Sequence, residues 1–211
     1  MFEIRKFFVI PFLAFLGFIF YSETCFPQTV IVSLGDSLTE GYGVDKDEAF
    51  PSLLENKLIA KGYSVKIINA GISGSTSASA PSRIKWYLRS KPDIIILSLG
   101  GNDGLRGLST KFMKKNLGEA IEIAQSAGVK ILLSGMQIPG NYGLIYTESF
   151  RKVFYELAEK YNIKMIPFLL ENVGGVAALN LPDGIHPNSE GHKIIAETVV
   201  KSLEPLLAKV N

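Results

Sequence analysis

Four short segments combine glycine with side chains that could take part in nucleophilic or proton-transfer chemistry. Ser37 follows an apolar run in "TVIVSLGDSL", Gly74 lies in "NAGISGSTSAS", and Asn102 lies in "LGGNDG". Far downstream, Asp183 stands three residues before His186 in "LPDGIHPNSEGH". A turn between these two would let the carboxylate accept a hydrogen bond from one imidazole nitrogen and leave the other nitrogen free. A hydroxyl, an oriented imidazole and neutral N–H donors can together serve nucleophilic chemistry.

Each of these residues also has an ordinary structural explanation. A serine beside a glycine often caps a helix, and a glycine alone permits a turn. Asn102 could be another cap, and His186 could be a surface histidine satisfied by the Asp183-Gly184 turn. Taken one at a time the segments do not separate these alternatives, so the elements that position them must decide.

Short, β-branched and nearly continuous apolar runs predict strands that are buried on both faces. These runs are residues 29–34, 64–69, 93–100 and 129–135, with a fifth at 163–169. Longer stretches with helical spacing lie between them or after them, several closing on glycine. These helical stretches are residues 50–62, 109–128, 148–162 and 190–210, the last broken near Pro205.

Alternating strands and helices predict an α/β fold, a three-layer α/β/α sandwich around a parallel five-stranded, flavodoxin-like sheet. Ligands bind such sheets at the carboxyl ends of the strands. Ser37, Gly74 and Asn102 each follow a predicted strand, and Pro187 biases His186 away from helix. Their joint placement at one edge is much less ordinary than any of the segments alone.

Composition excludes several classes of protein. The 211 residues are 47% hydrophobic and 20% charged, which suits one folded domain and a leader rather than a disordered chain. The formal net charge is +2 with scattered basic residues, so no nucleic-acid surface is indicated. One cysteine and two histidines exclude a disulfide framework and a Cys/His zinc site.

Residues 1–28 read as a leader, and residues 29–211 as the folded domain. Arg5-Lys6 precedes a charge-free run from Phe7 to Tyr21, which is closer in length to a signal-peptide core of about 7–15 residues than to a spanning helix of about 20. We expect an exported protein, periplasmic or membrane-anchored. Cys25 raises the option of a lipoprotein, although "SETC" fits that signal badly, and an uncleaved short anchor is the alternative.

The segments resemble the blocks of the SGNH, or GDSL, esterase family in the same order. They are Gly35-Asp36-Ser37-Leu38, Gly74, Gly100-Gly101-Asn102-Asp103 and Asp183-Gly184-Ile185-His186. The resemblance runs from about Val30 to the final helix, and "GGNDGLRG" and "MQIPGNYG" are similar to loops of the bacterial arylesterase, thioesterase and lysophospholipase group. Thr39 replaces the last glycine of the G-x-S-x-G elbow, so the oxyanion geometry of α/β-hydrolases does not transfer.

The resemblance implies a role for each block. Ser37 would be the nucleophile, His186 the general base and acid, and Asp183 the residue that fixes the imidazole tautomer. The backbone N–H groups of Ser37 and Gly74 and the side chain of Asn102 would form the oxyanion hole. No metal or organic cofactor is implied. Two residues lie outside these roles: Asp36 is predicted to be a structural capping group, and His192 an exposed helix residue.

The expected substrates are small-molecule carboxylic esters, thioesters or lysophospholipids. Two apolar loops are predicted to line the acyl site through Leu105, Leu108, Ile138 and Tyr142. A carbohydrate O-acetyl esterase is the alternative within the enzymes, since it would use the same blocks with a different acyl pocket. A non-catalytic nucleotide- or flavin-binding flavodoxin-like protein is a second alternative, which gives Asp183 and His186 no task.

Overall fold

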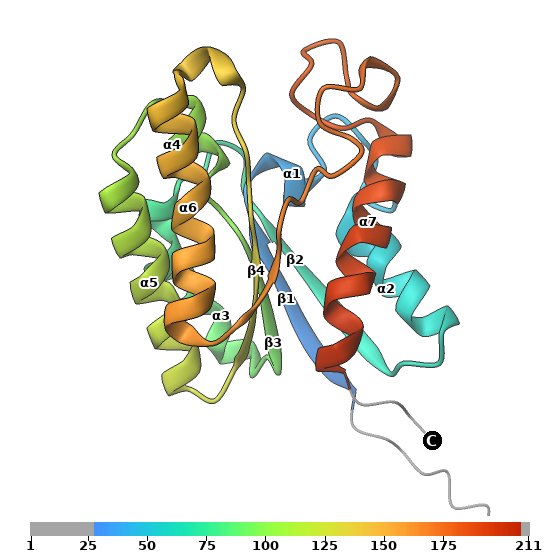
Figure 1. Ribbon diagram of the computed structural model, residues 1–211. Helices are drawn as coiled ribbons and strands as arrows, with labels where there is room; N and C mark the ends of the chain where they lie inside the picture. Colours follow the sequence, from blue (N-terminus) through green and yellow to red (C-terminus); the bar gives the residue numbers. More distant parts are fainter. Residues whose placement is uncertain (1–27, 208–211) are drawn as a thin grey trace, which may run out of the picture.

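The computed structural model describes residues 28–207, so the predicted leader and Cys25 lie outside the described residues. Five parallel strands form one sheet in the order β2-β1-β3-β4-β5 (Figure 1). The strands are β1 (Thr29–Gly35), β2 (Val65–Gly71), β3 (Ile94–Ser98), β4 (Lys130–Ser134) and β5 (Lys164–Ile166). The predicted parallel five-stranded sheet is confirmed.

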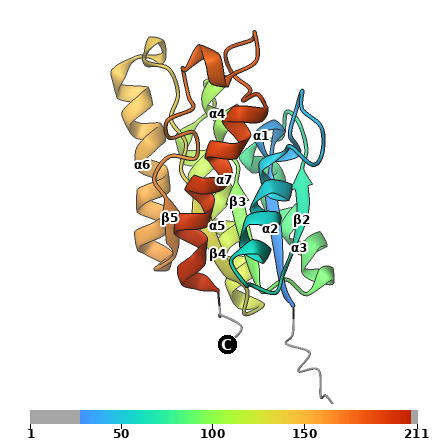
Figure 2. The same ribbon diagram turned by 90° about the vertical axis from the view of Figure 1, so that its right-hand side faces the viewer.

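Helices cover both faces of the sheet, which explains why its central strands are apolar throughout. The helices α2 (Phe50–Ala60) and α7 (Ser189–Leu203) pack together on one face and lie in front of the sheet in Figure 2. The helices α3 (Ala80–Tyr87), α5 (Thr110–Ser126) and α6 (Leu144–Tyr161) cover the other face. Every residue of β3 is buried as a result.

The core is continuous across the three layers. Its largest fully buried side chains include Phe50 below α7 and the pair Phe150 and Phe154, whose rings meet edge to face with centroids 5.5 Å apart. Edge-to-face packing adds about 0.5–1.5 kcal/mol to the burial of two such rings. The sheet is therefore held rigidly between the helices, and its carboxyl edge is a fixed platform for the loops above it.

Several element boundaries differ from the predicted ones. Strand β5 keeps three residues because Pro167 cannot continue the ladder. Helix α3 was not predicted, since its eight residues carry little apolar periodicity. Helix α6 begins at Leu144, four residues earlier than predicted. The break near Pro205 is confirmed: α7 ends at Leu203 and the 3-10 turn η5 (Glu204–Leu206) follows.

All parallel strands end at the same edge, at the top of Figure 1, and the short helices α1 (Ser37–Glu40) and α4 (Gly101–Leu105) begin there. Within residues 28–207, no helix combines the length and apolar character needed to span a bilayer. The four sequence blocks all lie in segments that follow strands at this edge.

Candidate active site

The turn from β1 into α1 presents Ser37 at the end of the central strand. Asp36 is the N-cap of α1, and its Oδ1 accepts from the Leu38 backbone N–H at 3.1 Å, as the sequence predicted. A Cβ on Gly35 would lie 1.9 Å from Thr39 Oγ1, so any larger residue would push the turn apart. Gly35 is therefore required by packing, and Asp36 caps the helix that follows. The Ser37 side chain is left half-buried at the end of the strand.

Ser37, His186 and Asp183 form one continuous hydrogen-bonded chain. The Oγ of Ser37 lies 2.9 Å from His186 Nε2, and His186 Nδ1 lies 2.7 Å from Asp183 Oδ2. This geometry places the imidazole proton on Nδ1, where it donates to the carboxylate, and leaves Nε2 to accept from the serine hydroxyl. Residues 149 positions apart in the chain are brought into direct contact.

A tight turn fixes the Asp183 carboxylate before it meets the imidazole. Its Oδ1 accepts from the backbone N–H of His186 at 3.0 Å and of Ile185 at 2.9 Å. The N–H of His186, the ring of His186 and the N–H of Ile185 together lower the pKa of Asp183 to about 2, from 3.8. The carboxylate is therefore ionised at neutral pH and points at the ring.

Tyr42 is a site residue that the sequence reasoning missed. Its ring lies against the His186 ring, with centroids 4.6 Å apart and planes inclined by 42°. The Tyr42 backbone N–H also donates to the Ser37 carbonyl at 3.1 Å, which ties its position to the serine turn. The preceding Gly41, with φ of +86°, ends α1 in the left-handed conformation and directs the chain towards His186. No motif signal marks an aromatic residue in that place.

Asn102 and Gly74 face the same region from the loops after β3 and β2. The Nδ2 of Asn102 donates to the Ser75 carbonyl at 3.0 Å and lies 3.4 Å from Asp36 Oδ2. Gly74 has φ of +76°, and its carbonyl accepts from Arg106 Nη2 at 3.1 Å. The side chains of α4 and its last turn thus hold the loop that carries Gly74.

Buried polar contacts brace these loops from below. Asp103 accepts from the Ser77 N–H at 2.8 Å and from the Ser77 hydroxyl at 2.6 Å. Arg83 of the unpredicted helix α3 donates through Nη1 to the Gly35 carbonyl at 2.9 Å and through Nη2 to the Ala70 carbonyl. The ends of β1 and β2 are therefore joined by one guanidinium, a role that sequence alone gave no way to assign.

Asp36 is buried between the serine turn and Asn102. Burial raises the pKa of Asp36 to about 6 from 3.8, although the Leu38 N–H acts in the opposite direction. A carboxyl with this pKa is still largely ionised at neutral pH, so it serves as a hydrogen-bond acceptor for both neighbours.

His192 was predicted to be an exposed helix residue, and that prediction is wrong. It is 1% exposed, and its Nδ1 accepts from the Phe50 backbone N–H at 3.2 Å. The start of α2 has no side-chain cap of its own, because Ala49 occupies the N-cap position. His192 supplies the missing acceptor from α7, and burial lowers its pKa to about 4 from 6.5.

The predicted acyl-site residues lie in two loops that touch. Tyr142 donates through its hydroxyl to the Leu105 carbonyl at 2.7 Å. Ile138 packs closely over Gly104, where an added Cβ would lie 2.6 Å from Ile138 Cγ2. Leu108 and Tyr142 are exposed, whereas Leu105 and Ile138 are half-buried. The loops after β3 and β4 therefore form one wall beside Asn102.

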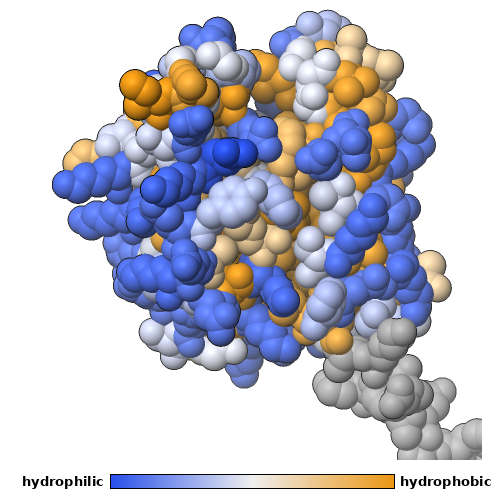
Figure 3. All heavy atoms as spheres, in the orientation of Figure 1, coloured by the Kyte–Doolittle hydropathy of each residue, from blue (hydrophilic) through white to orange (hydrophobic). Residues whose placement is uncertain are grey.

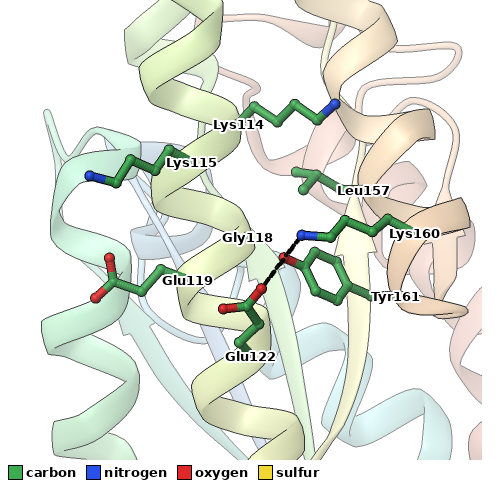
Figure 4. Close-up of a pocket in the computed structure, with 8 residues that line it drawn as sticks. All are labelled: Lys114, Lys115, Gly118, Glu119, Glu122, Leu157, Lys160 and Tyr161. Atoms are coloured by element: carbon green, nitrogen blue, oxygen red, sulfur yellow. Dashed lines mark hydrogen bonds and ion pairs between the residues drawn. The ribbon is translucent and has the colours of Figure 1, made fainter.

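A polar hollow of about 400 Å³ lies away from this edge, between α5 and α6. Figure 4 shows Glu122, Lys160 and Tyr161 converging in it. Tyr161 donates to Glu122 Oε1 at 2.5 Å, and Lys160 lies 3.5 Å from the same oxygen. These groups satisfy one another, and the hollow contains no serine, cysteine or histidine. It therefore has no nucleophile and base comparable to Ser37 and His186. Among the described residues, no cluster of three His, Cys, Asp or Glu could hold a metal ion.

A hydroxyl, an imidazole and a carboxylate in series, beside N–H donors at the carboxyl edge of an α/β/α sheet, have the geometry of a serine-hydrolase site. Residues 33–194 match the GDSL-like Lipase/Acylhydrolase family. The chain belongs to this family and is an ester hydrolase. Membership sets aside the nucleotide- or flavin-binding interpretation.

Relatives match the chain over nearly its whole length. Esterase TesA of Pseudomonas aeruginosa is 37% identical over 193 residues, which are 91% of this chain and 96% of the relative. Thioesterase 1/protease 1/lysophospholipase L1 of Escherichia coli K12 is 33% identical over 196 residues, 92% of this chain and 93% of the relative. The crystal structure of TesA has a TM-score of 0.82 and 39% identity, covering 85% of this chain and all of that one.

Proposed function

We propose that the protein hydrolyses carboxylic esters and thioesters through a Ser37-bound acyl-enzyme. The observation that carries the proposal is the continuous chain from Ser37 Oγ to His186 and on to Asp183, at 2.9 and 2.7 Å. As Oγ attacks the carbonyl carbon, its proton passes to His186 Nε2. Collapse of the tetrahedral intermediate expels the alcohol or thiol, which takes that proton. Water then repeats both steps on the acyl-enzyme.

Asp183 makes the imidazole a better base without taking its proton. Its carboxylate keeps the Nδ1 proton in place and stabilises the imidazolium that forms in each transition state. A pKa of about 2 means that this charge is present wherever the imidazole can act as a base.

The oxyanion would be held by the N–H groups of Ser37 and Gly74 and by Asn102 Nδ2. The amide of Asn102 has two N–H groups, and the 3.0 Å bond to the Ser75 carbonyl uses one. The other faces Asp36 at a long 3.4 Å and is free to turn to a stronger acceptor, the developing oxyanion. Arg106 holds the Gly74 carbonyl and so orients the peptide next to the Gly74 donor.

The acyl chain would lie along the wall formed by Leu105, Leu108, Ile138 and Tyr142. Each methylene buried there contributes about 0.8 kcal/mol at full burial, so kcat/KM should rise with chain length until the wall is covered. We expect an optimum of about C6–C10, a range set by that increment alone, and comparable cleavage of thioesters and lysophospholipids.

The experiment is a panel of p-nitrophenyl esters and acyl thioesters of graded length, assayed with wild type and Ser37→Ala. A rise from acetate to a medium-chain optimum that disappears in Ser37→Ala is expected. A monotonic fall from acetate would instead favour a carbohydrate O-acetyl esterase, to be tested on acetylated sugars, without changing the roles of the three residues.

The protein is proposed to act after export, in the periplasm or at a membrane. The support is the charge-free run from Phe7 to Tyr21 behind Arg5 and Lys6. Fractionation of bacteria that express the full chain and Cys25→Ser tests this localisation. Full-length protein recovered from the cytosol would contradict export, and unchanged membrane association of Cys25→Ser would remove the lipoprotein option.

A further inference from the structure

Exposed apolar side chains gather at one end of the molecule. Of twelve large exposed apolar residues within residues 28–207, three lie in the middle or at the end of helices: Ile59, Trp86 and Tyr155. The other nine lie in the loops and first helical turns that follow the strands, at the edge of the sheet that carries Ser37. A soluble protein scatters such residues singly, so their concentration at one edge indicates an interaction surface.

Five members of this group form what we call the α6 rim, over the start of α6 and the neighbouring loop. It consists of Leu108, Phe112, Tyr142, Leu144 and Ile145. Leu144 is 71% exposed and Ile145 is 85% exposed, side by side at the first turn of α6. Figure 3 shows apolar surface at this place, at the upper left of the molecule, above a hydrophilic flank.

Hydrogen bonds join the two segments of the α6 rim into one surface. The Tyr146 hydroxyl donates to the Leu108 carbonyl at 2.7 Å, as the Tyr142 hydroxyl does to Leu105. The rings of Tyr142 and Tyr146 lie 6.4 Å apart between centroids. The apolar tips are thus presented on a braced support, which avoids an ordering cost when they are buried.

Charge around the α6 rim selects its partner. Three cations flank it, Arg106, Lys111 and Arg151, and none forms an ion pair with any residue that the structure describes. The acid nearby is Glu148 in the second turn of α6. The other half of the same edge, formed by loops after β1 and β5, carries exposed acids: Asp45, Asp47, Glu171 and Asp183. That half also carries exposed Lys46, between Asp45 and Asp47, so its acids outnumber its cations and the half that bears the apolar tips is the more positive one.

We propose that the α6 rim docks the protein on an anionic lipid surface, with Leu144 and Ile145 inserted between the headgroups. Protruding apolar side chains and unpaired cations on one face are what such an interface requires. Leu108 and Tyr142 belong both to the rim and to the proposed acyl wall. If the proposed function holds, docking brings the wall against the layer in which acyl chains reside.

Vesicle binding of the full chain tests this proposal, with vesicles of equimolar phosphatidylcholine and phosphatidylglycerol or of phosphatidylcholine alone. Leu144→Ser combined with Ile145→Ser should weaken sedimentation with the anionic vesicles by about tenfold or more. The matched control, Ile59→Ser combined with Trp86→Ser, removes two exposed apolar residues near the C-terminal ends of α2 and α3. It should change vesicle binding by less than about twofold. Lys111→Gln and Arg151→Gln should each cost about fivefold, for anionic vesicles alone.

Hydrolysis of soluble p-nitrophenyl butyrate by all these variants keeps the docking claim separate from the catalytic one. Unchanged turnover with selectively weakened vesicle binding is the expected pattern. Equal binding of wild type and every variant would assign lipid binding to another part of the chain and overturn the proposal. Absence of wild-type binding, or equal weakening in the control pair, would overturn it as well.

Discussion

Two histidines six residues apart do different work because their surroundings differ. His186 lies in the loop before α7, half-buried, with its nitrogens on Asp183 and Ser37. His192 is the fourth residue of α7, buried against α2, and its Nδ1 accepts from the Phe50 N–H. One imidazole contacts the Ser37 hydroxyl and stays partly exposed, whereas the other accepts a hydrogen bond at the start of α2. Residue type alone therefore predicts neither role.

Substituting the two histidines in turn should have the largest effects, because His186 is expected to control activity and His192 stability. His186→Ala and Ser37→Ala should each lower kcat/KM by about 10³-fold or more, since both act in the same proton transfer. His192→Asn, which keeps a side-chain acceptor near Phe50, should retain near-normal turnover. Ester hydrolysis is measured alongside far-UV circular dichroism. Near-normal turnover by folded His186→Ala would end the comparison.

The pH dependence of activity tests His186 as the general base. Its imidazole must be neutral to accept the Ser37 proton, so kcat/KM should fall as the pH is lowered and the ring becomes protonated. The same profile should persist in His192→Asn. A flat profile between about pH 5 and 8 would remove His186 as the base.

Asn102 is the proposed oxyanion donor, and its substitution tests a role different from that of either histidine. Asn102→Ala should lower kcat by about 10²–10³-fold with a smaller change in KM, because the N–H now 3.4 Å from Asp36 Oδ2 would bind the oxyanion only in the transition state. Steady-state kinetics on a medium-chain ester separate the two constants. A change confined to KM would reassign Asn102 to substrate binding.

His192 should dominate an acid-sensitive part of stability. Its pKa is about 4 in the folded protein and 6.5 as an ordinary value, so the unfolded chain takes up the proton first as pH falls. The stabilising contribution is complete above pH 6.5 and is lost progressively towards pH 4, on the order of 3 kcal/mol in total. Asp36, whose pKa is raised from 3.8 to about 6, changes stability in the opposite direction over that window.

Comparison of wild type with His192→Asn isolates the histidine, because Asp36 is common to both. Urea denaturation between pH 7 and pH 4 should show the wild type losing stability relative to the variant. His192→Ala should be less stable than His192→Asn at pH 7 by about 1–3 kcal/mol, since it leaves the Phe50 N–H buried without an acceptor. If the free energy of unfolding changed with pH in the same way in wild type and His192→Asn, the acid sensitivity would arise from a group other than His192.

The sequence predicted what periodicity and local motifs encode, and it failed where tertiary contacts decide. Buried apolar runs revealed the sheet, and the Asp183–His186 spacing revealed a turn that the structure contains. Helix α3 was missed because its eight residues carry little apolar periodicity, and Arg83 went unassigned with it. His192 was misjudged because its partner, the uncapped start of α2, lies 142 residues away in the chain.

The smallest expected effect concerns Tyr42, which lies on the His186 ring. Tyr42→Phe keeps an aromatic face and should retain kcat, whereas Tyr42→Leu should lower kcat by about twofold to fivefold, because a ring face stabilises the imidazolium by about 0.5–1 kcal/mol. Equal kcat values for the two variants would show that the ring contact has no role in turnover.

Covalent labelling with a p-nitrophenyl alkylphosphonate tests the central claim most directly, because the reagent reacts with an activated serine and stays attached. Mass spectrometry of wild type and His192→Asn should show one adduct per chain, on the peptide that contains Ser37. His186→Ala should label at least about 10³-fold more slowly, and Ser37→Ala not at all. An adduct on another residue, or equally fast labelling of His186→Ala, would contradict a Ser37 nucleophile activated by His186.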